Sequence, residues 1–527
     1  MNAILLLCVG LAPIVWLFFA FIHFRLPGHV ACPCGLLLAA ALALFVIGKA
    51  PADVATAALE GAVFALWPIL LAVLAAMILY RYSVETGGME TIKKLLTGIS
   101  RDKRILALIL AWGFGGFLEG IAGFGVPVLI VGSILVALGF NPMLAVVVCL
   151  VANCISTPFA TVGVPVSALA GVTGLDVGVL GANAATQLFL LSLILPFFLV
   201  MLVGGGARAI KGIGLITLIA GISFALPLLL TSRFMGPELP ALFSSICAIV
   251  CVTAANKRFY RDDAYNKRFR IESASSGEAK LPNPGEAKLP NPGEAPPASV
   301  YQACLPFALA LITITATSLI APIRETLGKI RFDTVVYAGE GGNTLSFAPL
   351  LSPGILIIIS LIIACFLQRV SLAALLRIAG KTVMESRNMI ITIITIVAMA
   401  KIMDYSGMTD AIAVMLIAVF AVFYPLVAPV IGMLGTFITG SATTSSILFG
   451  SLQAGAARAI GVDPAWIASA GLSAAAVGKM ISPQSIAIGL RIGGLDGKEG
   501  EILRKTLKYA LVCTGIICLI SYFGTLF

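Results

Sequence analysis

Charged residues are scarce in this chain. They make up 11% of its 527 residues, whereas soluble domains carry roughly 25%. Hydrophobic residues make up 60%, and many apolar runs approach or exceed the ~20 residues that cross a bilayer as a helix. A chain this long and apolar cannot bury its surface in one water-soluble core. The composition therefore predicts an all-α polytopic membrane protein with the lipid bilayer as its main partner.

Groups that commonly bind metals or nucleotides are also rare. His23 and His29 are the two histidines, and the eleven cysteines form no CxxC pair and mostly lie in apolar runs. Gly113-Phe-Gly115-Gly116 lies within an apolar run, and Gly478-Lys479-Met480 lacks the spacing of a phosphate-binding loop. We therefore expect no metal, no cofactor, no ATP-driven step and no enzymatic activity.

Twelve apolar runs predict transmembrane spans, and two others predict re-entrant hairpins. Each hairpin run is too long for one helix, short for two crossings, and interrupted by a Gly-rich polar turn. The first run has no basic n-region and no small-residue cleavage site, so we interpret it as a span. The spans are expected near 2–22, 31–48, 54–80, 143–171, 188–203, 212–230, 237–255, 301–321, 351–368, 388–403, 466–490 and 507–526, the hairpins near 105–138 and 427–455, and 411–426 stays unassigned.

The net charge of +10 is concentrated in alternate loops. The loops at 23–30, 81–104, 204–211, 256–300, 369–387 and 491–508 hold 26 of the 34 Lys and Arg, and the opposite loops hold six. This asymmetry marks the basic side as cytoplasmic and places both termini outside. Basic residues in short loops between apolar runs do not indicate nucleic acid.

The two halves of the chain share paired motifs. Phe117-Leu-Glu119-Gly120 and Phe437-Ile-Thr439-Gly440 lie at the hairpin centres, and Thr157-Pro158 and Ser482-Pro483 break the spans that follow. Because the hairpins enter from opposite sides, the pattern predicts an inverted repeat. The expected units are an N-terminal half (1–203), two linking helices (204–255), a disordered cytoplasmic linker (256–300) containing a tandem octapeptide over 277–292, and a C-terminal half (301–527).

Two charged residues lie deep in apolar runs. Glu119 is about 14 residues into its run, where a carboxylate is costly unless it is protonated, paired or hydrated. It could couple transport to protons, or it could hydrogen-bond the amides of the hairpin tip. Lys479 lies about 13 residues into its span and could pair with a substrate carboxylate or with Glu119.

Small hydroxyl residues mark the second hairpin and the broken spans. They could bind a carboxylate and a neighbouring hydroxyl, although helix packing through small residues and ordinary proline kinks are alternative explanations. Backbone amides at the hairpin tips would assist an anion. The predicted substrate site comprises Ser441, Thr443, Ser445, Asn153, Thr157, Ser482, Gln484 and Lys479, with Glu119 for proton coupling and Gly120, Gly123, Thr439 and Gly440 at the hairpin tips.

Three stretches resemble the bacterial lactate permease family. They are residues 117–127 (FLEGIAGFGVP), Thr439-Gly440-Ser441 through Gln453, and residues 478–485 (GKMISPQS), the last being the most specific. The resemblance spans nearly the whole chain apart from 256–300. It implies a plasma-membrane symporter for lactate, glycolate and related 2-hydroxy acids, within a superfamily whose hairpin-bearing members work by an elevator motion.

The expected function is therefore proton-coupled symport of small monocarboxylates across the bacterial inner membrane. A sodium-coupled carboxylate or citrate-type carrier of the same superfamily is an alternative, because Ser, Thr and Asn also suit sodium. An anion channel is a third, although the sequence has no clear charged ring or filter motif. The oligomeric state is not indicated by the sequence.

Overall fold

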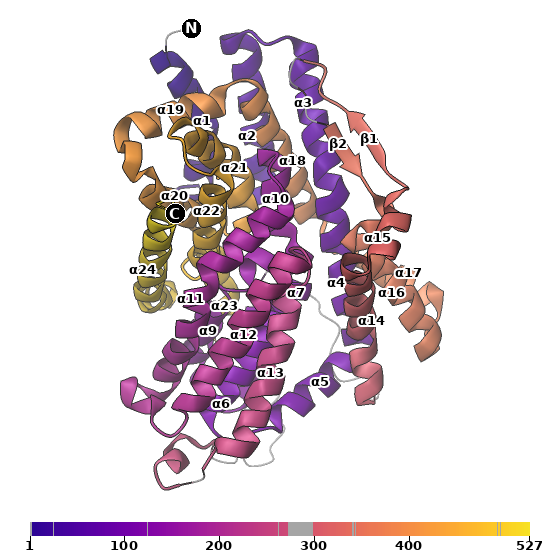
Figure 1. Ribbon diagram of the computed structural model, residues 1–527, viewed down its shortest axis with the longest axis vertical. Coiled ribbons are helices and arrows are strands. Elements are labelled where there is room, and N and C mark those ends of the chain that lie inside the picture. Colours follow the sequence, from indigo (N-terminus) through magenta and orange to yellow (C-terminus); the bar gives the residue numbers. More distant parts are fainter. Residues whose placement is uncertain are drawn as a thin grey trace.

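The computed structural model describes the chain except for residues 1–2, 25, 124, 262, 272–298, 340–341, 343, 493, 496 and 527. The described residues are nearly all helical, with one two-stranded antiparallel sheet in which Phe332 pairs with Phe347 (Figure 1). The helices and strands are α1 Ala3–Ile22, α2 Gly28–Leu42, η1 Ala43–Ile47, α3 Pro51–Phe64, η2 Ala65–Leu70, α4 Leu71–Glu85, α5 Gly88–Thr97, α6 Lys103–Ala107, η3 Leu108–Phe114, α7 Gly115–Ile121, α8 Val126–Ala137, α9 Pro142–Ala152, η4 Thr157–Phe159, α10 Ala160–Thr173, α11 Val177–Gly204, η5 Ala207–Ile210, α12 Gly214–Phe234, α13 Pro240–Phe259, η6 Asn266–Phe269, α14 Val300–Leu319, α15 Ala321–Gly328, β1 Phe332–Val335, β2 Thr344–Phe347, η7 Pro349–Leu351, α16 Pro353–Gln368, α17 Leu372–Glu385, α18 Arg387–Tyr405, α19 Met408–Phe420, η8 Ala421–Phe423, α20 Tyr424–Thr439, α21 Ala442–Ala459, α22 Pro464–Gly478, α23 Pro483–Leu490 and α24 Glu499–Phe523.

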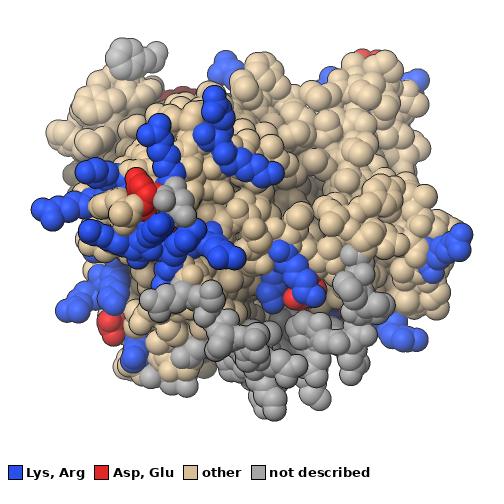
Figure 2. Space-filling view, turned by 90° about the horizontal axis from the view of Figure 1, so that it is seen from below, with Lys and Arg blue, Asp and Glu red and all other residues tan. Residues whose placement is uncertain are grey.

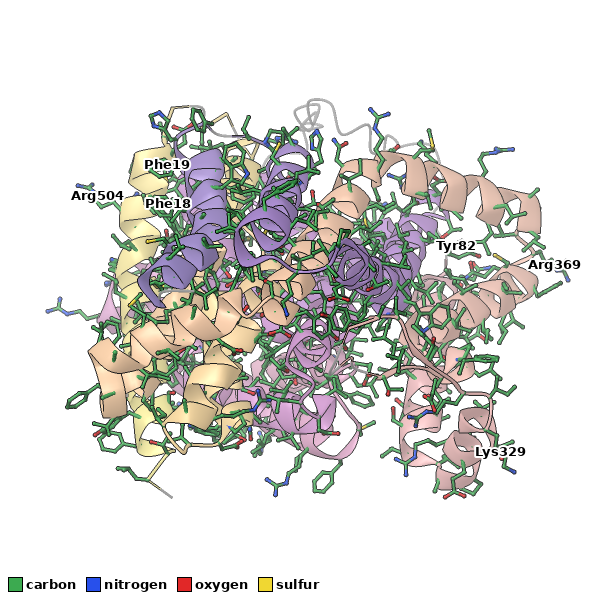
Figure 3. The ribbon with its side chains drawn as sticks, turned by 90° about the horizontal axis from the view of Figure 1, so that it is seen from above. Phe18, Phe19, Tyr82, Lys329, Arg369 and Arg504 are labelled. Carbon is green, nitrogen blue, oxygen red and sulfur yellow. The ribbon has the colours of Figure 1, made fainter. Side chains whose placement is uncertain are left out.

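The outer surface of the bundle is apolar, as a bilayer requires. Phe18 and Phe19 on α1 are 43% and 50% exposed and point away from the bundle (Figure 3). Eleven helical segments of the described chain are long and apolar enough to cross a membrane, and the bent pair α9 and η4–α10 would make twelve. The count agrees with the predicted twelve spans, but its membership differs. It includes the first arm of each hairpin, within Lys103–Ile121 and Met408–Thr439, and it leaves out the predicted spans 2–22 and 351–368, whose apolar helices are shorter.

Both predicted hairpins are present as pairs of packed helices. In the first, α6, η3 and α7 form one continuous arm over 103–121, and α8 returns beside it. At 1.5 Å per residue the 12 residues of α8 extend about 18 Å, too short for a bilayer core of about 30 Å. In the second, α20 and α21 pack together. Because α6 lies near the lower end of the molecule and α19 near the upper end, the chain enters the two hairpins from opposite ends (Figure 1).

One order of elements occurs twice along the chain. A long helix, a short helix, a hairpin, a broken helix and a long helix form the series α4, α5, α6–α8, α9–α10 and α11, and again α18 to α24. Tyr82-Ser83 lies in the last turn of α4 and Tyr405-Ser406 at the end of α18, and in each case a left-handed glycine, Gly87 or Gly407, precedes the next helix. This order supports an inverted repeat and accounts for the unassigned run 411–426, which forms most of α19.

The basic loops on one side fold onto one another. Arg104, buried at the base of the first hairpin, pairs with Asp102 and donates to the carbonyl of Ala209 and to Oδ1 of Asn266. Residues 263–271 pack here, and the Ile271 amide donates to the Arg101 carbonyl. The predicted linker therefore begins later than residue 256. Helix α13 continues to Phe259, and the segment that follows α13 contacts Arg104 through Asn266 and Phe269. The tandem octapeptide lies outside the described residues.

Two further expectations were wrong. The span predicted at 188–203 starts eleven residues earlier, at Val177. Its polar residues lowered the apparent hydropathy, yet Gln187 is fully buried and donates to the Trp466 carbonyl. The hairpin β1–β2 was not predicted, because its strands are only four residues long and the residues of β1 are all exposed.

Candidate functional site

A pocket of about 50 Å³ lies where the two hairpin tips meet the two broken helices. Segments from both halves contribute, since α10 packs against α21 and α8 packs against α23. The lining residues are Glu119, Gly125, Thr157, Ala160, Thr161, Pro165, Gly440, Ser441, Ala442, Thr443, Lys479, Gln484, Ser485 and Ile488. Seven of these were predicted from the sequence, and they come together from positions more than 300 residues apart.

The tip of the first hairpin is built on left-handed glycines. Gly123 and Gly125 have φ of +58° and +85° and separate α7 from α8. A Cβ at Gly123 would lie 2.5 Å from Thr161 Oγ1, so the tip needs glycine both for its backbone and for its close approach to α10. Gly120 was predicted at the tip but lies inside α7, where it packs against Ala241 and Leu242.

The tip of the second hairpin presents the start of a helix to the pocket. Gly440, with φ of +72°, ends α20, and Ser441 caps α21 by accepting from the Thr444 amide. The hydroxyl of Thr439 donates to the Gly435 carbonyl and accepts from the Ser441 amide. Ser445 does not line the pocket, contrary to the prediction, because its hydroxyl donates to the Gly432 carbonyl and joins the two arms.

The first broken helix turns by 69° between α9 and η4–α10. Thr157 lines the pocket and donates to the Asn153 carbonyl, which the break leaves without its helical partner. Thr161 and Val162 have left-handed backbones with φ of 49° and 58°, which are strained for residues that carry a Cβ. Sequence reasoning missed Thr161, which has no motif of its own.

The second broken helix resumes at Pro483. Ser482 caps α23 by accepting from the Ser485 amide, and its hydroxyl also bonds the Ser485 hydroxyl at 2.8 Å. Ser482 therefore lies behind the pocket, while Gln484 and Ser485 line it. A Cβ at Gly440 would overlap the Gln484 side chain, so hairpin tip and broken helix are in close contact here.

Glu119 and Lys479 form a buried ion pair in the pocket. Lys479 Nζ donates to Glu119 Oε1, and the Asn153 amide donates to Oε2 at 3.0 Å. Glu119 is fully buried and Lys479 is 8% exposed. Of the two partners expected for Lys479, the structure shows Glu119. Asn153 lies behind this carboxylate and not on the pocket wall.

Three helices start at the pocket. The first residues of α8, α21 and α23 follow Gly125, Ser441 and Ser482, and all three segments line or adjoin the cavity. The first N–H groups of a helix have no acceptor within the helix, and they carry partial positive charge. Together with Lys479, these helix starts favour a small anion bearing hydrogen-bonding groups.

Besides the Arg104–Asp102 pair, a further buried ion pair, between Lys401 and Glu60, lies outside this pocket and was missed. Lys401 Nζ lies 2.9 Å from Glu60 Oε1, and the Tyr405 hydroxyl donates to both Glu60 oxygens. The ring of Tyr337, which follows β1, stacks on Tyr405 with centroids 3.8 Å apart. This cluster joins α3, α18 and the β hairpin. Glu60 lies in the run 54–80, whose hydropathy predicts a span. The sequence offered no further pattern that would have predicted the pairing of Glu60 with Lys401.

A helical membrane protein with opposed hairpins and a small polar pocket at their tips has the architecture of a membrane transport protein. The chain belongs to the L-lactate permease family, whose sequence model matches residues 7–526. It is accordingly a multi-pass protein of the bacterial inner membrane, in a family of transporters and not of enzymes.

Individual relatives agree over nearly the full length. The chain is 41% identical to an L-lactate permease of Streptococcus iniae over 88% of this chain and 93% of that protein. It is 34% identical to the glycolate permease GlcA of Escherichia coli K12, over 97% of this chain and 94% of that protein. It is 32% identical to an L-lactate permease of Bacillus subtilis 168, over 99% of this chain and 96% of that protein. Among solved structures, the Alcanivorax borkumensis YdaH transporter aligns with a TM-score of 0.48 at 13% identity, covering 89% of this chain and 87% of that one.

Proposed function

We propose that this protein carries lactate and related 2-hydroxy monocarboxylates together with one proton, as a symporter. Relatives similar over nearly the full chain are named for L-lactate or glycolate, which are both small 2-hydroxy acids. The observation that carries the proposal is the Glu119–Lys479 pair inside a pocket where helices start.

The coupling follows from counting charges. In the empty pocket Glu119 and Lys479 sum to zero. When a proton neutralises Glu119, Lys479 is released and can pair with an incoming carboxylate, so the loaded pocket again sums to zero. Binding of the anion alone would give the pocket a net charge of −1, and binding of the proton alone would give it a net charge of +1. A net charge is costly within the membrane interior. Both neutral states can therefore move across the membrane, and the charged ones cannot.

The remaining groups suit a short hydroxy acid. The hydroxyls of Ser441 and Thr443 and the amide of Gln484 line the pocket and can bond a carboxylate and a 2-hydroxyl. A cavity of about 50 Å³ is small even beside the 150 Å³ that holds benzene, which has as many heavy atoms as lactate, so the proposal requires the pocket to widen as the substrate enters. Since the pocket is built from tips and breaks of both halves, we propose that hairpins and broken helices move together, as in an elevator.

Uptake by proteoliposomes tests this function. Lactate, glycolate, acetate and citrate are offered under an imposed pH gradient or an imposed sodium gradient. The proposal expects saturable uptake of lactate and glycolate driven by the pH gradient alone. Drive by sodium alone would favour the sodium-coupled alternative, and lactate currents that do not saturate would favour a channel.

A further inference from the structure

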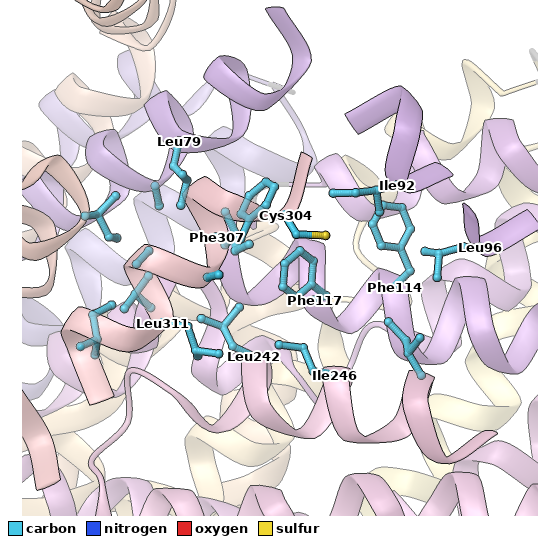
Figure 4. A pocket seen from close by; sticks show the side chains of 18 of the residues that line it. Leu79, Ile92, Leu96, Phe114, Phe117, Leu242, Ile246, Cys304, Phe307 and Leu311 are labelled. Atoms are coloured by element: carbon cyan, nitrogen blue, oxygen red, sulfur yellow. The ribbon is translucent and has the colours of Figure 1, made fainter. Parts of the chain in front are cut away.

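A second cavity, of about 290 Å³, lies between α13, α14 and the first hairpin (Figure 4). Almost all of its lining is apolar, and the residues come from α4, α5, η3, α7, α10, α13, α14 and α16. Phe117 on α7 and Phe307 on α14 meet edge to face within it, with ring centroids 5.4 Å apart. An apolar cavity of about 150 Å³ already binds benzene, so this one has room for a hydrocarbon segment.

The cavity reaches the outer surface between α5 and α13. Leu95 and Val250 line it and are 51% and 58% exposed, and Cys304 at its edge on α14 is exposed. The Asn256 amide donates to the Ile99 carbonyl at 3.2 Å, which keeps the ends of α5 and α13 together. Exposed apolar residues at such an opening face lipid in a membrane protein.

Basic residues lie just beyond this opening. Val250, Ala254, Lys257 and Arg258 are all exposed, and their spacing of four, seven and eight residues places them on one face of α13. Lys257 is about 10 Å along the helix from Val250. On α5, exposed Lys94 adjoins Leu95. Figure 2 shows that Lys and Arg gather on this lower face, which the loop charges predict to be cytoplasmic.

We propose that this cavity is a binding site for an anionic phospholipid of the inner leaflet. One acyl chain occupies the cavity between Phe117 and Phe307, and the phosphate lies near Lys94, Lys257 and Arg258. A phospholipid suits this site for two reasons. The opening of the cavity faces the bilayer, and the basic residues lie about 10 Å further along α13, where the phosphate of a bound lipid would be. The lipid would contact α7 at Phe117 and Ile121, on either side of Glu119, so its acyl chain would lie beside the transport pocket, but the site does not depend on which substrate is carried.

Native mass spectrometry of purified protein given phosphatidylglycerol or phosphatidylethanolamine tests this site. We expect phosphatidylglycerol to be retained in preference. Each basic residue near a membrane surface contributes about fivefold to anionic lipid binding, so Lys257→Ala/Arg258→Ala should weaken retention roughly 30-fold. Lys498→Ala/Arg504→Ala, which removes the same charge elsewhere on exposed positions, should change nothing.

A cavity-filling variant tests the acyl chain. Ala308 lines the cavity, and Ala308→Trp should abolish retention of phosphatidylglycerol, with Ala308→Leu as a smaller filler if the Trp variant does not fold. A phosphatidylglycerol carrying a photoreactive tail should label 103–121 and 300–319. Equal retention of both lipids, equal loss in the control double variant, or full retention in the filled variants would overturn the proposal.

Discussion

At the scale of single residues, the pocket contains one buried ion pair, between Glu119 and Lys479. Glu119 and Lys479 each came from the sequence as a charged residue deep in an apolar run. The sequence left their pairing open, because 360 positions separate them and pairing of Lys479 with a substrate carboxylate suited the same pattern. Asn153 and Ser482 were predicted as pocket walls, but they hold the wall residues in place instead.

Removing Lys479 should have two separable effects. Lys479→Met leaves the Glu119 carboxylate buried without a partner, which costs about 3–5 kcal/mol of stability. Adding Glu119→Gln should restore most of that stability, since no charge then remains. Neither variant should bind lactate, because the positive partner of the carboxylate is gone. Thermal unfolding and equilibrium binding in detergent measure the two effects.

The buried Glu60–Lys401 pair provides the matched control for that experiment. Lys401→Met should destabilise the protein similarly, because Glu60 is fully buried. The double variant Glu60→Gln/Lys401→Met should recover stability and keep lactate binding, since this pair does not line the pocket. Lactate binding by the Lys479→Met/Glu119→Gln double variant would remove Lys479 from the site.

At the scale of elements, the hairpin tips and helix breaks are what the sequence predicted well. Glycine, proline and small hydroxyl residues in an apolar run interrupt a helix by local chemistry, so Gly440 and Ser482-Pro483 could be located without tertiary information. Helix α19 and the early start of α11 could not be located in this way. The apolar run of α19 is too short to assign as a span from hydropathy alone. Buried polar residues such as Gln187 lower the hydropathy of the first part of α11, so it resembles a loop.

Gly440→Ala should abolish transport while the protein still folds. The left-handed backbone at φ of +72° costs an alanine about 1 kcal/mol, and its Cβ would push Gln484 away from the pocket. Gly461→Ala is the control, because Gly461 has a φ of +74° and no heavy atom within 4 Å of its Cβ position. Uptake in proteoliposomes should be lost in the first variant and kept in the second. Equal loss in both would assign the effect to backbone strain alone.

At the scale of the whole molecule, loop charge predicts which end faces the cytoplasm. In a cysteine-free background, Lys329→Cys, in the exposed segment between α15 and β1 (Figure 3), should react with a membrane-impermeant maleimide added outside cells. Lys498→Cys, before α24, should react only after the cells are opened. Labelling of both from outside would contradict the predicted topology between these two positions, and the reverse order would contradict the predicted orientation.

The proton-coupled pocket is tested most directly by Glu119→Gln in proteoliposomes. Glutamine imitates the permanently protonated carboxyl, so Lys479 stays available for the substrate carboxylate. The variant should exchange internal for external lactate at a rate near that of the unmodified protein, but it should not concentrate lactate when only a pH gradient is imposed. Glu60→Gln, the same change in the Glu60–Lys401 pair, should still exchange lactate and still concentrate it under a pH gradient, provided that the variant folds. Accumulation of lactate by Glu119→Gln under the pH gradient alone would contradict the account and leave Glu119 with a structural role.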